Sequence, residues 1–153
     1  MNAELARNVA AAVSPGGTSA WCISTDHLFA GTRSGYREDD APEPLNEYAR
    51  SKLLAEEWVQ QAHPQPLILR TNFFGWGHAY RQSFSDWVIQ ALRAGQPVTM
   101  FDDVAPRRSS PTHWRGPRTA SSRCHAGGTF NVPGDERVSE IRICGALGAH
   151  FQL

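Results

Sequence analysis

The sequence is poor in lysine, in excess charge of either sign and in long apolar runs. It has 153 residues, and 14 of its 15 basic side chains are arginines, which leaves Lys52 as the only lysine. Since 15 acidic side chains balance them, the chain lacks the basic surplus that nucleic-acid binding requires. No apolar run approaches the ~18 residues of a membrane span, and the first residues lack the pattern of a signal peptide. We therefore expect a cytoplasmic protein with no nucleic-acid or membrane partner.

Cysteine is also scarce. Cys22, Cys124 and Cys144 form an odd and widely spaced set, which argues against a disulfide framework and against a zinc site. His113 and His125 stand near Cys124 without the spacing of metal ligands, so we predict no metal. With 41% hydrophobic and 20% charged residues, the composition is that of an ordinary globular protein.

Helical and strand patterns alternate over the first hundred residues. Leu5, Val9, Ala12 and Val13 form one apolar stripe on the first expected helix. Alternation of helices with short buried strands predicts an α/β fold with a parallel sheet. The expected helices are residues 2–13, 45–62 and 83–94, with a weak terminal helix over 139–153; the expected strands are residues 20–23, 66–71 and 97–101.

Tyr48 and Lys52 lie four residues apart on the second expected helix, so their side chains share one face. An ammonium group beside a phenol stabilises the phenolate, which makes a tyrosine usable as a general acid or base near neutral pH. Thr25 follows a predicted strand, at the end where open α/β sheets bind ligands. Three such groups around one carbonyl oxygen are typical of hydride transfer, with a cofactor supplying the hydride.

Each of these residues also has a plainer interpretation. The spacing of Tyr48 and Lys52 occurs by chance in many helices, where it belongs to a solvated ion-pair face. Thr25 could cap the turn that follows it, and Phe73 could pack against the sheet. The order of the segments favours the catalytic interpretation, because the threonine follows a buried strand and the tyrosine lies on the next helix.

Four stretches of sequence, taken in order, carry a family resemblance. They are a strand end that contains Thr25, a Tyr-Ala-Arg-Ser-Lys helix start, a Leu-Arg-Thr strand end with an aromatic loop, and a late Gly-Thr-Phe-Asn-Val run. Together they resemble the extended short-chain dehydrogenases/reductases, and within them the dTDP-4-dehydrorhamnose reductase-like sugar-nucleotide reductases. The stretches are residues 24–31, 38–52, 69–77 and 128–139.

The resemblance implies a role for each residue. Tyr48 would protonate the reduced keto group, Lys52 would bind the nicotinamide ribose, and Thr25 would polarise the substrate carbonyl. The cofactor would be NADPH or NADH, and the partner would be a nucleotide-sugar substrate. The expected cofactor contacts are Tyr48, Lys52, Thr71 and Asn72, and the expected substrate contacts are Thr25, His27 and Phe73.

The resemblance also divides the chain. Residues 1–103 would be the second half of an NAD(P)-binding Rossmann domain, and residues 128–153 would be a remnant of a sugar-nucleotide-binding region. Because the sequence has no glycine-rich phosphate-binding turn, we expect it to begin at the helix before the fourth strand of such a domain. Residues 104–127 hold five arginines and no acidic residue, which indicates either a basic patch or a disrupted reading frame.

The expected function is the NADPH-dependent reduction of a dTDP-linked 4-keto-6-deoxy sugar in dTDP-rhamnose biosynthesis. The protein would be an oxidoreductase of α/β fold, and a homodimer is compatible with this expectation. The alternatives are a nucleotide-sugar epimerase or dehydratase, a non-catalytic NAD(P)-binding regulatory relative, and an inactive fragment.

Overall fold

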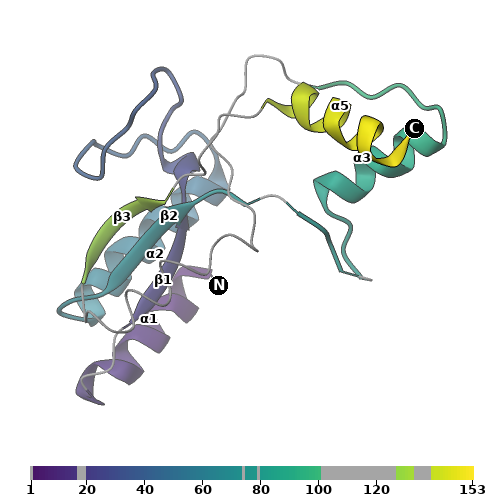
Figure 1. Ribbon diagram of the computed structural model, residues 1–153. Coiled ribbons are helices and arrows are strands. Elements are labelled where there is room, and N and C mark those ends of the chain that lie inside the picture. Colours follow the sequence, from purple (N-terminus) through teal and green to yellow (C-terminus); the bar gives the residue numbers. More distant parts are fainter. Residues whose placement is uncertain (1, 17–19, 74, 79, 101–126, 133–138) are drawn as a thin grey trace. The chain divides into compact units, whose positions relative to one another are not determined.

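The computed structural model describes residues 2–16, 20–73, 75–78, 80–100, 127–132 and 139–153 (Figure 1). Two compact units form. The first consists of residues 1–71 with 116–132, and the second consists of residues 72–115 with 133–153. Residues 104–126 lie outside the described residues, so the basic patch and the disrupted reading frame both stay predictions.

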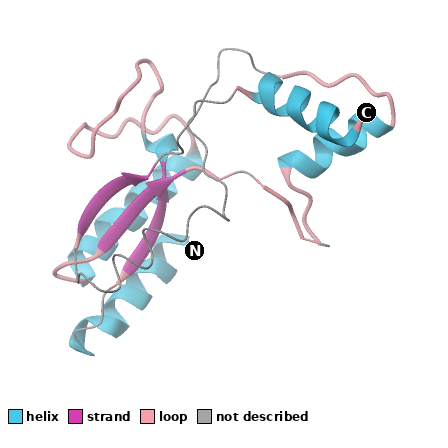
Figure 2. Ribbon diagram, viewed as in Figure 1, coloured by secondary structure: helices cyan, strands magenta, loops and turns pink. Residues whose placement is uncertain are grey.

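A three-stranded parallel sheet forms the centre of the first unit (Figures 1 and 2). Its strands are β1 (Trp21–Thr25), β2 (Leu67–Thr71) and β3 (Gly128–Val132), in the spatial order β1-β2-β3. The central strand β2 is buried along its whole length, as expected of a strand with a neighbour on each side. This sheet confirms the predicted α/β fold.

Two helices, α1 (Asn2–Val13) and α2 (Glu47–Ala62), pack against each other on one face of the sheet (Figure 1). Helix α2 begins where the side chain of Asn46 accepts a hydrogen bond from the backbone N–H of Ala49, at 2.8 Å. The core between the helices and the sheet contains Ala10, Ala20, Cys22, Val59 and Ile68.

Most of the apolar stripe of α1 is exposed. Ala3 and Ala10 are buried, whereas Leu5 and Val9 are exposed. Alanine side chains let two helices approach closely, and this places the alanine side of α1, and not the larger apolar stripe, against α2. Of the residues in the stripe, only Val13 packs against the core.

The second unit contains two packed helices, α3 (Phe84–Arg93) and α5 (Glu140–Phe151). Helix α3 begins with a capping box, in which Ser83 and Asp86 exchange hydrogen bonds with each other's backbone N–H groups. The strand expected over residues 97–101 is not found, because its described residues, 97–100, have no regular structure. A short strand needs a neighbour to pair with, and β3 takes the place beside β2.

The residues that the structure describes include no helix that is both long enough and apolar enough to cross a membrane.

Candidate active site

Thr25 is the last residue of β1, and its side chain is buried. The backbone N–H of His27 donates to Thr25 Oγ1 at 3.2 Å, so the threonine caps the short 3-10 turn formed by Asp26–Leu28. This confirms that Thr25 caps the turn. The capping hydrogen bond occupies only a lone pair of the hydroxyl oxygen and does not use the hydroxyl proton. The hydroxyl proton points to Asp26 Oδ1 over a long distance of 3.5 Å, which leaves it available to a better acceptor.

Tyr48 lies in the first turn of α2, and half of its surface, 50%, is exposed. Its ring meets the ring of His27 edge-on, with 6.3 Å between the ring centroids and an angle of 89° between the planes. The turn that Thr25 caps therefore brings His27 against the phenol. The structure thus gathers Thr25, His27 and Tyr48 at the carboxyl end of β1.

Lys52 lies one turn after Tyr48 and reaches the same strand. Its Nζ donates a hydrogen bond to the backbone carbonyl of Ile23 at 2.8 Å. This bond ties α2 to β1 two residues before Thr25. It is a contact that the sequence did not predict, because only the folded chain brings a carbonyl 29 residues away within reach of the ammonium group.

Thr71 ends β2 and is the Cα partner of Thr25 in the parallel register. Its hydroxyl is buried and has no hydrogen-bond partner among the residues described here, and the same is true of the Ser24 hydroxyl on β1. A buried hydroxyl without a partner is costly, which makes it a candidate ligand contact. Asn72 and Phe73, the remaining predicted site residues, belong to the second unit.

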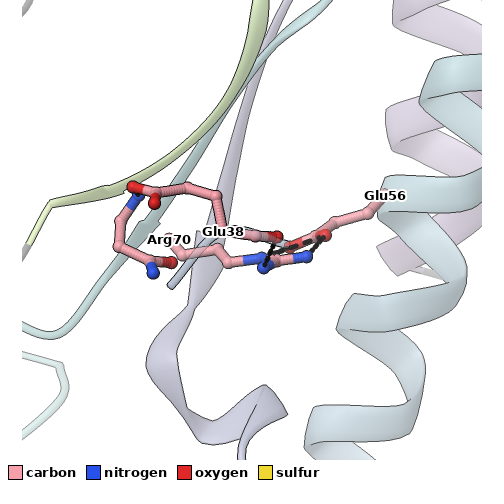
Figure 3. A network of polar contacts seen from close by, with 4 residues as sticks. Glu38, Glu56 and Arg70 are labelled. Atoms are coloured by element: carbon pink, nitrogen blue, oxygen red, sulfur yellow. Dashed lines mark hydrogen bonds and ion pairs between the residues drawn. The ribbon is translucent and has the colours of Figure 1, made fainter. Parts of the chain in front are cut away.

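A buried ion pair lies beside this cluster, and our sequence analysis did not identify it (Figure 3). Arg70 Nη2 and Glu56 Oε2 are 2.8 Å apart, and Arg70 Nε also donates to both carboxylate oxygens, at 3.1 and 3.2 Å. The side chains are only 7% and 3% exposed. Two signals were available in the sequence. An arginine interrupts the apolar strand Leu67–Thr71, and Glu56 lies four residues after Lys52 on the same helix face.

The same arginine holds the polar loop of residues 31–44 to the sheet. Arg70 Nη1 donates to the backbone carbonyl of Glu38 at 3.3 Å, and the Glu38 side chain accepts from the N–H of Asn131, on β3, at 2.8 Å (Figure 3). The hydrogen bond from Asn131 lowers the pKa of the Glu38 carboxyl. Asn131 Nδ2 also donates to the carbonyl of Tyr36 at 3.1 Å. The loop is therefore fastened to β2 and to β3.

Stacked aromatic rings and arginine side chains add to these contacts between the loop and the sheet. Arg70 lies over the ring of Phe29, which stacks on Tyr36 with 4.6 Å between the ring centroids. Arg33 covers the ring of Tyr36 and pairs with Asp40 at 2.6 Å. The loop is thus held at the sheet by ring contacts as well as by hydrogen bonds.

The chemistry of the site follows from these groups. It offers the hydroxyl of Thr25, the phenol of Tyr48, the ammonium of Lys52 and the unpaired hydroxyl of Thr71 at neighbouring strand ends. Hydroxyl, phenol and ammonium groups can polarise and protonate a carbonyl oxygen. The described residues include no group of three or more His, Cys, Asp or Glu side chains that could hold a metal ion.

Comparison with known proteins points to one family. The sequence matches the RmlD substrate binding domain over residues 1–117. It is similar to a probable low-salt glycan biosynthesis reductase of Haloferax volcanii, with 34% identity over 142 residues, which cover 85% of this chain and 46% of that protein. It is also similar to methionine adenosyltransferase 2 subunit beta of Danio rerio, with 39% identity over 145 residues, which cover 90% and 45%.

The fold also has a close counterpart among solved structures. It resembles the crystal structure of dTDP-4-dehydrorhamnose reductase from Bacillus anthracis in complex with NADP, with a TM-score of 0.89 and 25% identity. That match covers 100% of this chain and 54% of the other. The chain thus spans about half the length of the relatives it matches. The family match covers well over half of the sequence and includes the first three of the four stretches, so it confirms the family resemblance. The chain belongs to the RmlD substrate binding domain family.

Proposed function

We propose that this chain carries the catalytic residues of an NADPH-dependent reductase that acts on a dTDP-linked 4-keto-6-deoxy sugar. The observation that carries the proposal is the gathering of Thr25, His27 and Tyr48 at the carboxyl end of β1, with Lys52 one turn further along α2. Ligands of open α/β sheets bind beyond the carboxyl ends of the strands, which is where these side chains meet.

The residues present fit a nicotinamide cofactor. The Thr71 hydroxyl is buried, lacks a partner among the described residues and lies beside Thr25 in the register, so a polar group of a bound nucleotide would satisfy it. Tyr48, Lys52, Thr71 and Asn72 would hold the cofactor, as the family resemblance implies. When bound, the cofactor would supply the hydride.

The chain's own groups would act on the keto sugar. Thr25 accepts the His27 N–H, so its hydroxyl proton is free to turn toward the substrate carbonyl and polarise it. Tyr48 is exposed enough to reach that oxygen and would give it a proton. His27 and Phe73 would contact the sugar. The nucleotide-sugar partner, the cytoplasmic location and a homodimeric assembly belong to the same proposal.

Cofactor titration and turnover test this function. We expect the purified chain to bind NADPH, measured by quenching or enhancement of nicotinamide fluorescence. Replacement of Tyr48 by Phe should then lower turnover of a dTDP-4-keto-6-deoxy sugar by roughly 10²–10⁴-fold, because the proton donor is lost. The matched control is Tyr80→Phe, since Tyr80 is exposed and lies in the second unit. Unchanged turnover in Tyr48→Phe would show that the acid role is wrong.

The similarity to methionine adenosyltransferase 2 subunit beta supports a second candidate, a non-catalytic nucleotide-binding subunit of a larger enzyme. The same titration separates the two candidates. Binding of NADPH without turnover of any keto sugar favours the subunit, and net oxidation of NADPH favours the reductase. An epimerase or dehydratase would convert its sugar with no net oxidation of NADPH.

A further inference from the structure

His27 is held against Tyr48 by the turn that follows β1. The backbone N–H of His27 donates to Thr25 Oγ1, and the backbone N–H of Phe29 donates to the carbonyl of Asp26, both at 3.2 Å. These bonds close the turn on both sides of the histidine and fix the point from which its side chain projects. The imidazole then meets the phenol ring edge-on, with 6.3 Å between the ring centroids.

The next residue anchors this turn in the fold. Leu28 is completely buried, and its backbone carbonyl accepts a hydrogen bond from the N–H of Glu43 at 2.7 Å. The turn also packs against α2, the helix that carries Tyr48. Because the backbone is bonded on each side of His27, we expect the two rings to stay neighbours when the imidazole gains or loses a charge.

The titratable groups around the imidazole come from three elements. On its own turn, Asp26 Oδ1 lies 3.9 Å from His27 Nε2, which is too long for a hydrogen bond. Helix α2 contributes Tyr48 and Lys52, and the loop before α2 contributes the exposed Glu43. Carboxylates and ammonium groups ordinarily keep their charges near neutral pH, whereas an imidazole ordinarily titrates near pH 6.5. The imidazole is therefore the group of this set whose charge changes there.

The contact between the two rings has two possible consequences. An edge-on pair of rings is an ordinary packing contact, and a neutral ring would serve equally well. A protonated imidazole adds a positive charge about 6 Å from the phenol. At low ionic strength and between half-exposed groups, such a charge favours the phenolate about three- to tenfold.

We propose that His27 tunes the acidity of Tyr48 through its charge, so that the phenol gives up its proton more readily when the imidazole is protonated. In the reductase, Tyr48 passes its proton to the sugar oxygen while the carbonyl carbon receives the hydride. His27 keeps its own proton during this step and acts only by its charge, which makes it a positioning residue. The effect on the reductase rests on the proposed function, whereas the effect on the phenol concerns the two side chains alone.

Nitration of tyrosine tests the effect on the phenol without cofactor or substrate. Tetranitromethane reacts with phenolates, so the nitration rate of Tyr48 at a given pH follows its phenolate population. Peptide mass spectrometry measures this rate relative to Tyr80, which is 88% exposed, lies in the second unit and is the same in every variant. The chain is compared at low ionic strength at about pH 5.5 and about pH 8.5, on either side of the ordinary imidazole titration.

Two variants separate the ring from the charge. His27→Phe keeps a ring without a charge, and His27→Lys keeps a charge without a ring. At about pH 5.5, Tyr48 should be nitrated about three- to tenfold more slowly in His27→Phe than in the unaltered chain, and His27→Lys should stay within about twofold of the unaltered chain. At about pH 8.5, the unaltered chain should match His27→Phe, and His27→Lys should be about three- to tenfold faster than both.

The nitration outcomes decide the effect on the phenol. The inference is overturned if His27→Phe is nitrated as fast as the unaltered chain at about pH 5.5. It is also overturned if His27→Lys follows His27→Phe at that pH, because the ring and not the charge would then matter.

Turnover of the keto sugar decides the effect on the reductase. The ratio of turnover by the unaltered chain to turnover by His27→Phe should fall about three- to tenfold from about pH 5.5 to about pH 8.5, since the other groups of the site are common to both chains. A constant ratio overturns this part. If nitration follows the expected pattern but the unaltered chain does not oxidise NADPH, the proposed function fails and the effect of His27 on Tyr48 stands.

Discussion

The guanidinium of Arg70 and the carboxylate of Glu56 form a buried ion pair that joins β2 to α2. Replacement of Arg70 by Met leaves a buried carboxylate without its partner, so we expect a loss of about 3–5 kcal/mol in the free energy of unfolding. Urea denaturation followed by circular dichroism measures this loss. The matched control is Arg50→Met, which breaks the exposed pair with Glu47 and should cost at most about 1 kcal/mol.

A double replacement tests the cause of that loss. If the cost comes from the unpaired Glu56 carboxylate, the Arg70→Met chain should recover most of its stability when Glu56 is changed to Leu. A double variant that is as unstable as Arg70→Met would contradict this explanation. The fastening of the loop through the Glu38 carbonyl would then account for the role of Arg70.

The Glu38 carboxylate should make the first unit less stable in acid. The Asn131 N–H bonded to it lowers the pKa of Glu38 in the folded chain below its ordinary value of 4.5. The stabilisation is therefore complete above the ordinary pKa and is lost as the pH falls through the lower, folded-state pKa. Glu38→Gln should cost about 0.5 kcal/mol at neutral pH, because the carboxylate is exposed, and nothing in strong acid.

Thermal melting of both chains over a range of acidic pH measures this difference. The control Glu43→Gln removes another exposed carboxylate of the same loop and should change the free energy of unfolding by less than about 0.5 kcal/mol. A Glu38→Gln effect that stays constant down to the lowest pH would show that the carboxylate charge does not hold the loop.

The Cys22 thiol should report the charge of Lys52. Burial raises the pKa of Cys22, the Lys52 ammonium opposes this rise, and the Glu56 carboxylate adds to it. Lys52→Met should therefore raise the pKa of the thiol further, and Lys52→Arg should not. Ultraviolet absorbance of the thiolate, in chains whose other two cysteines are serine, follows the titration. Equal titration curves for the Met and Arg variants would contradict the position of the ammonium group.

Two glycines of the second unit should respond to alanine in opposite directions. A Cβ at Gly77 would lie 2.6 Å from both Asp86 Oδ2 and the Ser83 nitrogen, so Gly77→Ala should destabilise the start of α3 by about 1–3 kcal/mol. A Cβ at Gly145, inside α5, would meet nothing within 4 Å, and Gly145→Ala should stabilise by about 0.5–1 kcal/mol.

Hydrogen exchange of the α3 amides measures both changes within the second unit. The Ser83 N–H, the Ser83 hydroxyl and the Gly77 N–H all donate to Asp86 Oδ2, at 2.9, 2.8 and 2.8 Å, and these bonds lower the pKa of the Asp86 carboxyl. Faster exchange at the start of α3 is therefore expected in Gly77→Ala. Exchange that is equal in the two variants would show that the crowding at Gly77 relaxes without cost.

Local signals predicted most of the fold. The helix over residues 2–13 and the strands that became β1 and β2 lie where the sequence placed them to within about two residues, because their boundaries depend on nearby caps and apolar runs. Strand β3 was not among the expected strands. The strand expected over residues 97–101 was wrong, and the sequence did not show that most of the apolar stripe of α1 stays exposed, because both depend on which neighbour an apolar surface meets. Sequence periodicity shows that a surface is apolar but does not identify its neighbour.

In the candidate site, too, the sequence predicted local relations between residues but not long-range contacts. Tyr48 and Lys52 could be placed together because a helix fixes the relation between residues four apart. The bond from Lys52 to Ile23 and the loop bonds from Arg70 and Asn131 join residues 29 to 95 positions apart, and no local pattern encodes them. The pair of Glu56 and Arg70 was predictable only in part. A charged residue inside an apolar strand indicates that a buried partner of opposite charge exists, but it does not say which residue that partner is.

Helix α2 is anchored to two strands by side chains one turn apart, Lys52 to β1 and Glu56 to β2. Tyr48 lies one turn before them on the same face, so the position of the phenol depends on the number of residues between it and the two anchors. Deletion of a single residue between Tyr48 and Lys52 would rotate the phenol by about 100° around the helix axis while both anchors stayed in place. This stretch of the chain should therefore accept no change in length.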